Sequence, residues 1–138
     1  MSTNSDGGNP IGGLVLSGST LYGTAPNGGK WGNGTVFKIN TDGSEFRTLY
    51  SFDYLTYETY GLVLSNSALY GTTDLGGSWG YGSVFALNTD GTGFTILHSF
   101  PEPCYFCSPT TNTEGGYPLA SLILSEGTLY GTTGGGGD

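Results

Sequence analysis

Charged side chains are scarce in this sequence of 138 residues, and basic ones are the scarcest. There are 3 Lys and Arg residues against 11 Asp and Glu residues, which gives a formal net charge of -8. Binding to nucleic acid or to anionic lipid depends on clustered basic residues, so we expect neither partner. Exposed helices are rich in Glu, Lys and Arg, and a charged fraction of 10 % therefore argues against a helical protein.

Long apolar segments are also missing from the sequence. No run approaches the roughly 18 apolar residues that cross a bilayer, so we expect a soluble chain without a membrane span. Residues 1–12 have neither a basic start nor an apolar core, and they do not resemble a signal peptide. We therefore expect that the protein is cytoplasmic or that its export signal lies outside this chain.

Cysteine and histidine are too few for a metal centre. Cys104 and Cys107 form the sequence Cys-Tyr-Phe-Cys, and His98 is the single histidine. A structural zinc site takes four ligands, and a thioredoxin-like redox site needs a βαβ setting that the sequence does not indicate. We therefore expect no metal and no cofactor. Cys104 and Cys107 are predicted to form a local disulfide, with two free thiols as the alternative.

Glycine and aromatic residues are abundant instead. The sequence contains 27 Gly, and aromatic residues make up 14 % of it. Disordered chains are poor in aromatic residues, so the glycines indicate tight turns between strands rather than disorder. We expect an all-β protein.

The chain is built from a repeat of 48 residues. Residues 13–52 and 61–100 agree at 25 of 40 positions without a gap, and a partial third copy begins at Ser121. Short runs of β-branched and aromatic residues alternate with Gly-rich turns, which predicts four strands in each complete unit. The predicted strands are 13–17, 20–25, 35–40, 46–52, 61–65, 68–73, 83–88, 94–100, 121–125 and 128–133.

The period of the repeat is typical of a β-propeller blade, since WD40 blades have about 40–45 residues and kelch blades about 50. We predict an all-β, β-propeller-like fold with blades of four antiparallel strands, two complete and one partial. The predicted segments are a polar N-terminal segment (1–12), blade 1 (13–56), blade 2 (57–105), an inserted connection (106–120) and partial blade 3 (121–138).

A closed propeller needs about 4 to 8 blades, which is more than this chain supplies. Three explanations are open: a fragment of a longer protein, an incomplete gene product, and a protomer of a homo-oligomer that completes its ring with another copy. We favour the fragment because the sequence stops inside a repeat unit.

The motifs of the unit resemble those of a known family. Leu-Tyr-Gly-Thr is followed by Gly-Gly, Gly-Thr/Ser-Val-Phe, Asp-Gly-Thr/Ser and Leu-x-Ser-Phe in both complete units. These motifs are Leu21 to Thr24, Gly28-Gly29, Gly34 to Phe37, Asp42-Gly43 and Leu49 to Phe52, then Leu69 to Thr73, Gly76-Gly77, Gly82 to Phe85, Asp90 to Thr92 and Leu97 to Phe100. The sequence is similar to the Gloeobacter/Verrucomicrobia (GloVer) tandem repeat. The resemblance implies a propeller-like fold on secreted or surface-anchored bacterial proteins, hence an extracellular or cell-surface location, and it implies no catalytic residues and no substrate.

Trp31 and Trp79 occupy the same place in two Gly-rich loops, which makes them the leading candidates for ligand binding. Indole rings stack on the flat faces of sugars, and Tyr81, Asn33 and Asp74 would add polar contacts. Sites repeated in each blade would gain avidity. The alternative is that each Trp covers the neighbouring blade and donates its indole N–H to a carbonyl.

Catalysis has little support in the sequence. No Gly-x-Ser-x-Gly motif accompanies His98, and the spacing of Asp53, Glu58, Asp74 and Glu102 does not predict paired catalytic carboxylates. We expect a non-catalytic, exported β-repeat module that binds a glycan or another surface partner through blade-edge loops. The alternatives are a structural or assembly array without a small ligand, and a fragment of a propeller enzyme, quinoprotein-like or glycoside-active.

Overall fold

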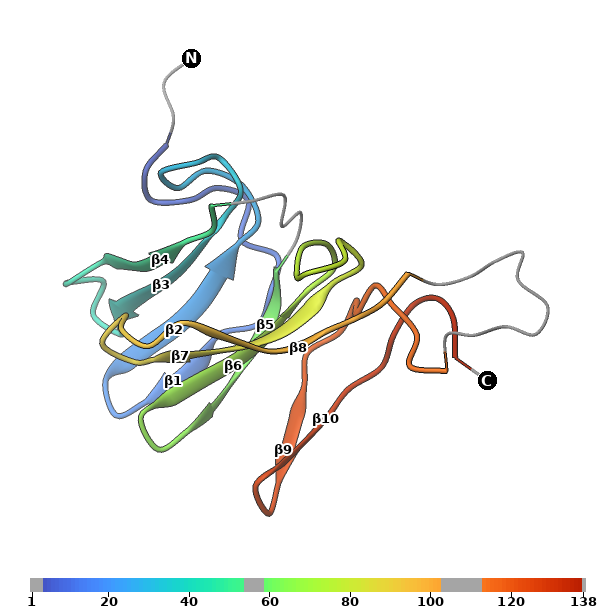
Figure 1. Cartoon of the computed structure of the whole chain (residues 1–138). Coiled ribbons are helices and arrows are strands. Elements are labelled where there is room, and N and C mark those ends of the chain that lie inside the picture. Colours follow the sequence, from blue (N-terminus) through green and yellow to red (C-terminus); the bar gives the residue numbers. More distant parts are fainter. Residues whose placement is uncertain (1–3, 54–58, 103–112, 138) are drawn as a thin grey trace.

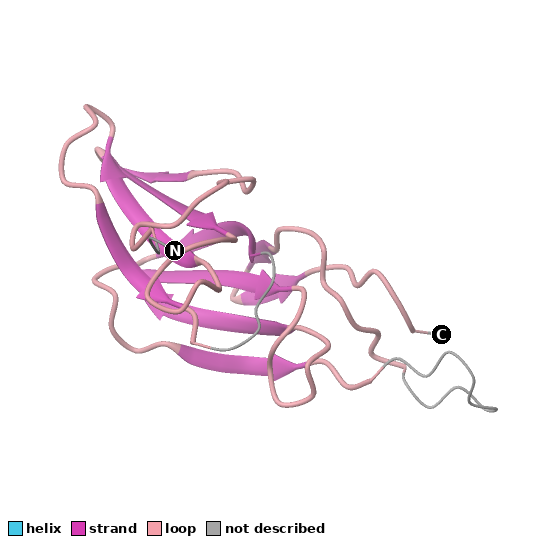
Figure 2. Cartoon of the chain, turned by 90° about the horizontal axis from the view of Figure 1, so that it is seen from above, coloured by secondary structure: helices cyan, strands magenta, loops and turns pink. Residues whose placement is uncertain are grey.

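The computed structural model describes residues 4–53, 59–102 and 113–137, and these residues form strands, turns and loops without a helix. Figure 2 shows strands joined by loops throughout this part of the chain. The prediction of an all-β fold is confirmed. The strands are β1 (Val15–Ser17), β2 (Thr20–Ala25), β3 (Thr35–Asn40), β4 (Arg47–Ser51), β5 (Thr59–Ser65), β6 (Ala68–Thr73), β7 (Ser83–Asn88), β8 (Thr95–Ser99), β9 (Ile123–Ser125) and β10 (Thr128–Tyr130).

The strands form two four-stranded sheets and one two-stranded sheet, and every pairing is antiparallel. The strand orders are β1-β2-β3-β4, β5-β6-β7-β8 and β9-β10, so each strand pairs with its neighbour in the chain. Figure 1 shows the two larger sheets next to each other, with the β9–β10 hairpin beyond the second sheet. The prediction of two complete four-stranded units and one partial unit is confirmed, although the described strands do not close a ring.

The two complete sheets repeat the same register. Leu21 pairs with Ile39 in the first sheet, and Leu69 pairs with Leu87 at the equivalent place in the second. Each sheet also has a register shift between its third and fourth strands, which lies at Val36/Phe37 in the first sheet and 48 residues later in the second. From the second strand to the fourth, the repeat in the sequence is therefore a repeat in backbone structure, including this bulge. The first strands differ, because β5 is longer than β1 and has a further register shift between Tyr60 and Val63.

The third unit has shorter strands than the sequence predicts. β10 ends at Tyr130, whereas the pattern predicts a strand to 133, and β9 begins at Ile123 rather than at 121. Among the described residues β10 pairs with β9 alone, whereas β2 and β6 each lie between two strands. β10 therefore lacks the second ladder of hydrogen bonds that β2 and β6 form.

Asp-Gly turns join the third strand to the fourth in both complete sheets. Gly43 and Gly91 have φ angles of 84° and 89°, a left-handed conformation that glycine adopts without steric cost. The carboxylate of Asp42 accepts hydrogen bonds from the hydroxyl and the N–H of Ser44, which lowers the pKa of Asp42 below its usual range. Asp90 accepts the same two bonds from the residue two positions ahead, and its pKa is lowered for the same reason.

The main core lies between the two complete sheets. Tyr22 and Val36 of the first sheet belong to one buried cluster with Leu69, Phe85 and Leu87 of the second. Because side chains alternate between the faces of a strand, each sheet can turn one apolar face toward its neighbour. Burial of such side chains contributes about 1.5–3 kcal/mol each. Stacking of successive units therefore provides most of the apolar burial.

The outer faces of the two sheets differ in how they are covered. Leu16 and Phe46 lie on the outer face of the first sheet and are about half exposed. The outer face of the second sheet meets the third unit, where Leu122 is buried and the hydroxyl of Thr72 donates to the carbonyl of Ala120 at 3.2 Å. The partial third unit thus continues the stacking of the first two.

Candidate functional site

Two Gly-rich loops, 26–34 and 74–82, carry Trp31 and Trp79. Each loop connects the second strand of a sheet to the third, so the two loops have equivalent places in the fold. Figure 1 shows the β2–β3 and β6–β7 connections at the same end of the sheets. The repeat therefore brings both tryptophan-bearing loops to one end of the molecule.

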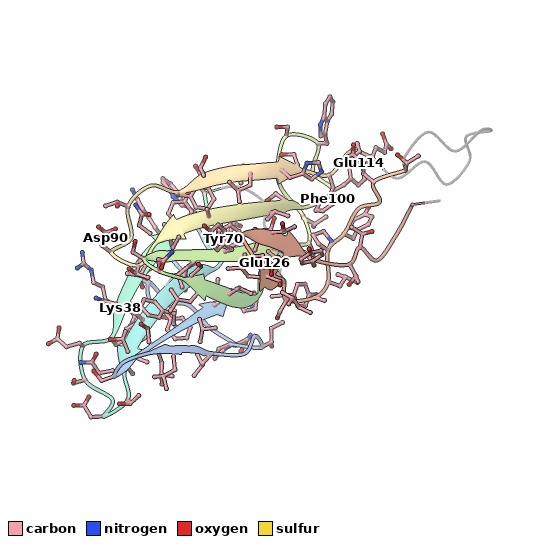
Figure 3. All side chains as sticks on the ribbon, turned by 90° about the horizontal axis from the view of Figure 1, so that it is seen from below. Lys38, Tyr70, Asp90, Phe100, Glu114 and Glu126 are labelled. Carbon is pink, nitrogen blue, oxygen red and sulfur yellow. The ribbon has the colours of Figure 1, made fainter. Side chains whose placement is uncertain are left out.

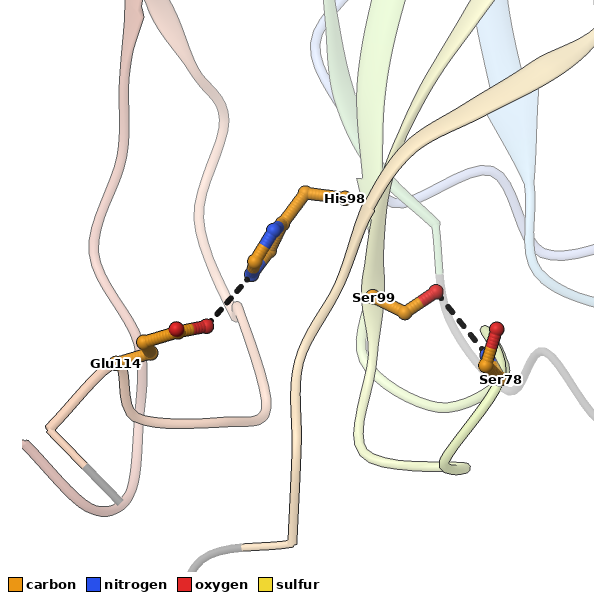
Figure 4. A network of polar contacts seen from close by, with 4 residues as sticks. All are labelled: Ser78, His98, Ser99 and Glu114. Atoms are coloured by element: carbon orange, nitrogen blue, oxygen red, sulfur yellow. Dashed lines mark hydrogen bonds and ion pairs between the residues drawn. The ribbon is translucent and has the colours of Figure 1, made fainter. Parts of the chain in front are cut away.

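Each loop is fixed to its own sheet by an equivalent hydrogen bond. The N–H of Lys30 donates to the hydroxyl of Ser51 at 3.3 Å, and the N–H of Ser78 donates to the hydroxyl of Ser99 at 3.1 Å. Figure 4 shows the second of these contacts. Both serines lie at the last position of the fourth strand, so the loop in each unit is tied across to the edge of its sheet.

Glycines allow the loops to fold back on themselves. The N–H of Gly34 donates to the carbonyl of Gly28 at 2.9 Å, and Gly82 donates to Gly76 in the same way at 3.2 Å. Gly29 has a φ of 78°, and a Cβ on it would lie 3.0 Å from the carbonyl oxygen of Gly34. The space beside Gly29 therefore admits glycine and excludes a side chain.

Both indole rings project into solvent. Trp31 is 55 % exposed and Trp79 is 66 % exposed. This exposure argues against the alternative in which each Trp covers the neighbouring blade. The ammonium of Lys30 lies 4.6 Å from the centroid of the Trp31 ring, which is within cation–π range. The loops thus offer flat apolar rings on a fixed backbone, and such rings can stack on a flat ligand.

The other predicted site residues are engaged within the protein. The ring of Tyr81 meets the ring of Tyr117 edge-on, with centroids 5.6 Å apart. A carboxylate oxygen of Asp74 accepts a hydrogen bond from the N–H of Leu75 at 2.7 Å. Asn33 is half-buried and forms an isolated β-bridge with its own loop. These residues support the loops directly, and each keeps part of its surface exposed.

An open groove of about 500 Å³ lies next to the loop of Trp31. Lys30 and Arg47, which are two of the three Lys and Arg residues of the chain, line it together with Asp6 and Ser51. Phe46 gives the groove an apolar side. The sequence did not indicate this groove because Asp6, Lys30 and Arg47 come from three segments without a shared motif.

His98 takes part in an ion-pair contact that the sequence did not indicate either. Its Nε2 lies 3.1 Å from a carboxylate oxygen of Glu114, and both side chains are about half exposed (Figure 4). The contact joins β8 to the chain just before the third unit. Ser99 faces its own loop and bonds to Ser78, so the described contacts do not align a serine with this His–Glu pair.

The remaining predicted chemistry divides into described and undescribed residues. Asp53 and Glu102 are exposed. Within residues 4–53, 59–102 and 113–137, no three His, Cys, Asp or Glu side chains lie close enough together to hold a metal ion. Glu58, Cys104 and Cys107 lie outside the described residues, so the predicted disulfide stays a prediction.

The fold and the loops define a tandem all-β repeat protein in which each complete four-stranded unit presents one exposed tryptophan. The chain belongs to the Gloeobacter/Verrucomicrobia repeat family, whose sequence model matches residues 1–138. This confirms the resemblance seen in the motifs. No curated protein and no solved structure matches the chain. In the part of the chain that the structure describes, no helix is long and apolar enough to cross a membrane.

Proposed function

We propose that the chain is a non-catalytic, exported repeat module that binds glycans through the loops of Trp31 and Trp79. The observation that carries the proposal is the exposure of both indole rings on loops with the same backbone anchors. A large ring that stays in solvent adds little to the stability of the fold. It is available to stack on the apolar face of a sugar instead.

The polar groups near each ring would set the orientation of a bound sugar. Lys30 and Arg47 lie in the groove beside the first loop, and they would donate hydrogen bonds to sugar hydroxyls. In the second loop, Asp74 and Tyr81 retain exposed surface and would add polar contacts. Each single site would be weak because one ring buries little area, and two sites on one glycan would gain avidity from their high effective concentration.

The extracellular or cell-surface location belongs to the same proposal. It rests on the kind of protein that carries this repeat, and it agrees with a glycan as the ligand. Localising the full-length gene product with an antibody to this module, in intact and in permeabilised cells, tests it. Staining that requires permeabilisation would contradict an exported module.

A glycan array followed by calorimetry with the best ligand tests the binding function. The variants are Trp31→Ala, Trp79→Ala and the double substitution, and Tyr130→Ala is the matched control because Tyr130 is a 55 % exposed aromatic residue outside the loops. We expect each single variant to bind more weakly and the double variant to lose binding, with unchanged far-UV circular dichroism. Failure of the intact chain to bind any glycan, or full binding by the double variant, would overturn the proposal.

A structural or assembly array is the second candidate, and one observation favours it. The outer face of the first sheet presents Leu14, Leu16 and Phe46 to solvent, and each is close to half exposed or more. Exposed apolar clusters of this kind mark protein contacts. Analytical ultracentrifugation over a range of concentrations tests this candidate. Association that Leu16→Ser reduces would support it, and a monomer at all concentrations would exclude it.

A further inference from the structure

The Lys and Arg residues of this acidic chain are confined to its first repeat unit. Lys30, Lys38 and Arg47 all belong to that unit, whereas acidic residues are spread along the whole sequence. Figure 3 shows Lys38 beside the first sheet, and it shows Asp90 and Glu126 in other parts of the molecule. The first unit is therefore the part of the chain that is best suited to attract an anion.

Two of these cations line the open groove beside the loop of Trp31. Lys30 and Arg47 are both exposed there, and the groove volume of about 500 Å³ lies in the range of small-molecule sites, about 300–1,000 Å³. In the part of the chain that the structure describes, neither cation has a carboxylate within ion-pair distance. Asp6 also lines the groove, and its carboxylate accepts a hydrogen bond from the hydroxyl of Ser5 at 3.1 Å. The lining thus carries two positive charges and one negative charge.

The strand register places two cations opposite each other. Lys38 of β3 pairs directly with Arg47 of β4. Like charges at directly opposed positions destabilise a sheet. The pKa of Asp90 is lowered chiefly by its hydrogen bonds to Thr92 and in smaller part by the charge of Arg47, so this turn offsets some of the repulsion. An anion bound in the groove would offset more of it.

The two cations that line the groove can act together with the indole ring. The N–H of Lys30 donates to the hydroxyl of Ser51, so the loop is held against the strand that carries Arg47. The ammonium of Lys30 lies 4.6 Å from the centroid of the Trp31 ring. An exposed cation–π contact is weak, so the ammonium can turn to a ligand carboxylate and free that face of the ring for a sugar. The guanidinium fork of Arg47 matches the two oxygens of a carboxylate.

The second unit has the same loop without the cations. The residues equivalent to Lys30 and Arg47 are Ser78 and Thr95, and both are exposed, as is Trp79. The first sheet packs against the second on the corresponding side, and these positions stay exposed all the same. Access to Lys30 and Arg47 is therefore independent of whether another unit stacks on the first sheet.

We propose that the groove beside Trp31 binds the carboxylate of a uronic acid, so that the first loop selects acidic glycans. The sugar ring stacks on Trp31, and its carboxylate contacts the Lys30 ammonium and the Arg47 guanidinium. The loop of Trp79 has no cation at the equivalent positions and takes neutral sugars. This selectivity rests on the proposed glycan binding and adds to it the class of sugar that one of the two loops prefers.

Calorimetry with two matched ligands tests the selectivity. An oligogalacturonate and its methyl ester have the same sugar backbone, and only the first is charged. In the chain with Trp79→Ala, where the first loop alone reports, we expect the acid to bind about 3- to 10-fold more tightly, since exposed ion pairs are individually weak. The difference should shrink as NaCl rises from about 50 mM to about 500 mM, because salt screens exposed charges. Equal affinity for the two ligands, or tighter binding of a sulfated galactan than of the oligogalacturonate, would overturn the proposal.

Exchange of residues between the units supplies the variants. Lys30→Ser with Arg47→Thr gives the first loop the residues that the second unit has, so the fold should tolerate both changes. In the Trp79→Ala chain this double variant should still bind the ester and should lose the preference for the acid. Adding Ser78→Lys and Thr95→Arg restores the net charge of the chain, and the preference should stay lost. A preference that survives in either variant would overturn the proposed site.

The same measurements separate this selectivity from glycan binding itself. Binding of the ester by the chain with both tryptophans, without a preference for the acid in the Trp79→Ala chain, would overturn the selectivity and leave the proposed function intact. Failure of the chain to bind either ligand or any neutral glycan would overturn both. Circular dichroism of each variant shows whether the fold is retained.

Discussion

The rings of Tyr50 and Phe94 stack almost parallel, with centroids 4.0 Å apart and an interplanar angle of 9°. Tyr50 lies on β4 of the first sheet, and Phe94 directly precedes β8 of the second. Burial, together with the negative charge of Asp53, raises the pKa of the Tyr50 hydroxyl. The pair therefore joins β4 of the first unit to the residue before β8 of the second, and within the described residues this stacked link occurs once. Phe46, which is the repeat equivalent of Phe94, stacks on Phe37 of its own sheet. His98, which is the repeat equivalent of Tyr50, packs against Phe100.

We expect Phe94→Ala to destabilise the protein far more than Phe46→Ala. The two phenylalanines are equivalent in the repeat, but Phe94 packs against Tyr50, Phe52 and Phe85, whereas Phe46 is 44 % exposed. Loss of a packed phenylalanine costs about 3 kcal/mol or more, and loss of the exposed one under about 1 kcal/mol. Urea unfolding curves measure both. Equal losses would mean that the contacts between units contribute little to stability.

The glycine of the Leu-Tyr-Gly-Thr motif should tolerate alanine in the third unit and not in the second. A Cβ on Gly71 would lie 2.6 Å from Phe85, which is fully buried and cannot shift, so Gly71→Ala should cost about 1–3 kcal/mol. In Gly131→Ala the new methyl group meets only the end of the Leu122 side chain, which borders a cavity. We expect a change under about 1 kcal/mol there. Thermal unfolding compares the two variants, and an equal loss in both would contradict an open space over Gly131.

The hydroxyls of Thr73 and Ser83 share a buried hydrogen bond of 2.8 Å in the second sheet. Thr73→Val or Ser83→Ala leaves one buried hydroxyl without this partner, which should cost about 1–3 kcal/mol. The double variant removes both polar groups, so we expect a smaller loss than the sum of the single losses. A double-mutant cycle from urea unfolding measures the coupling. Additive losses would show that the bond contributes nothing specific.

The turn aspartates should make the fold less stable in acid. The folded-state pKa of Asp42 and of Asp90 is lowered, so the stability they contribute is present above the usual Asp pKa of about 3.9 and is lost as the pH falls through the folded pKa. Ser44→Ala removes the hydroxyl donor and should raise the pKa of Asp42 toward its usual value without changing Asp90. Thr92→Val should raise the pKa of Asp90 in the same way without changing that of Asp42.

Carbon-13 NMR titration of the carboxyl groups measures these pKa values, and each variant is the control for the other. Urea unfolding of Ser44→Ala between pH 7 and pH 2 should show a smaller loss of stability in acid than the parent chain shows. An Asp42 pKa that is unchanged in Ser44→Ala would contradict the hydrogen-bond origin of the shift.

The strands could be predicted from the sequence because each is bounded by local signals. The bounds of β2 and β3 match the prediction, since a Gly-rich loop separates them and an Asp-Gly turn follows β3. The short β10 could not be predicted in this way because the length of a strand also depends on its partners. The alternation of apolar residues likewise does not tell which face of a sheet meets the next unit, so the burial of Phe85 against Phe52 became visible only in the structure.

The candidate site was predictable in position and not in form. The repeat placed Trp31 and Trp79 at equivalent points, but their exposure depends on how the loops fold back. The groove beside Lys30 and the contact of His98 with Glu114 join segments that differ between units. Long-range contacts outside a repeat have no periodic signal, and sequence patterns therefore miss them.

Every strand pairs with the one next to it in the chain, and this has a consequence for how the protein folds. Each sheet can form as a local meander with short loop closures, which lowers the entropic barrier compared with sheets that pair distant strands. The aromatic contacts between units can then form late, after both meanders exist. Substitutions such as Phe94→Ala should consequently accelerate unfolding while leaving the folding rate nearly unchanged.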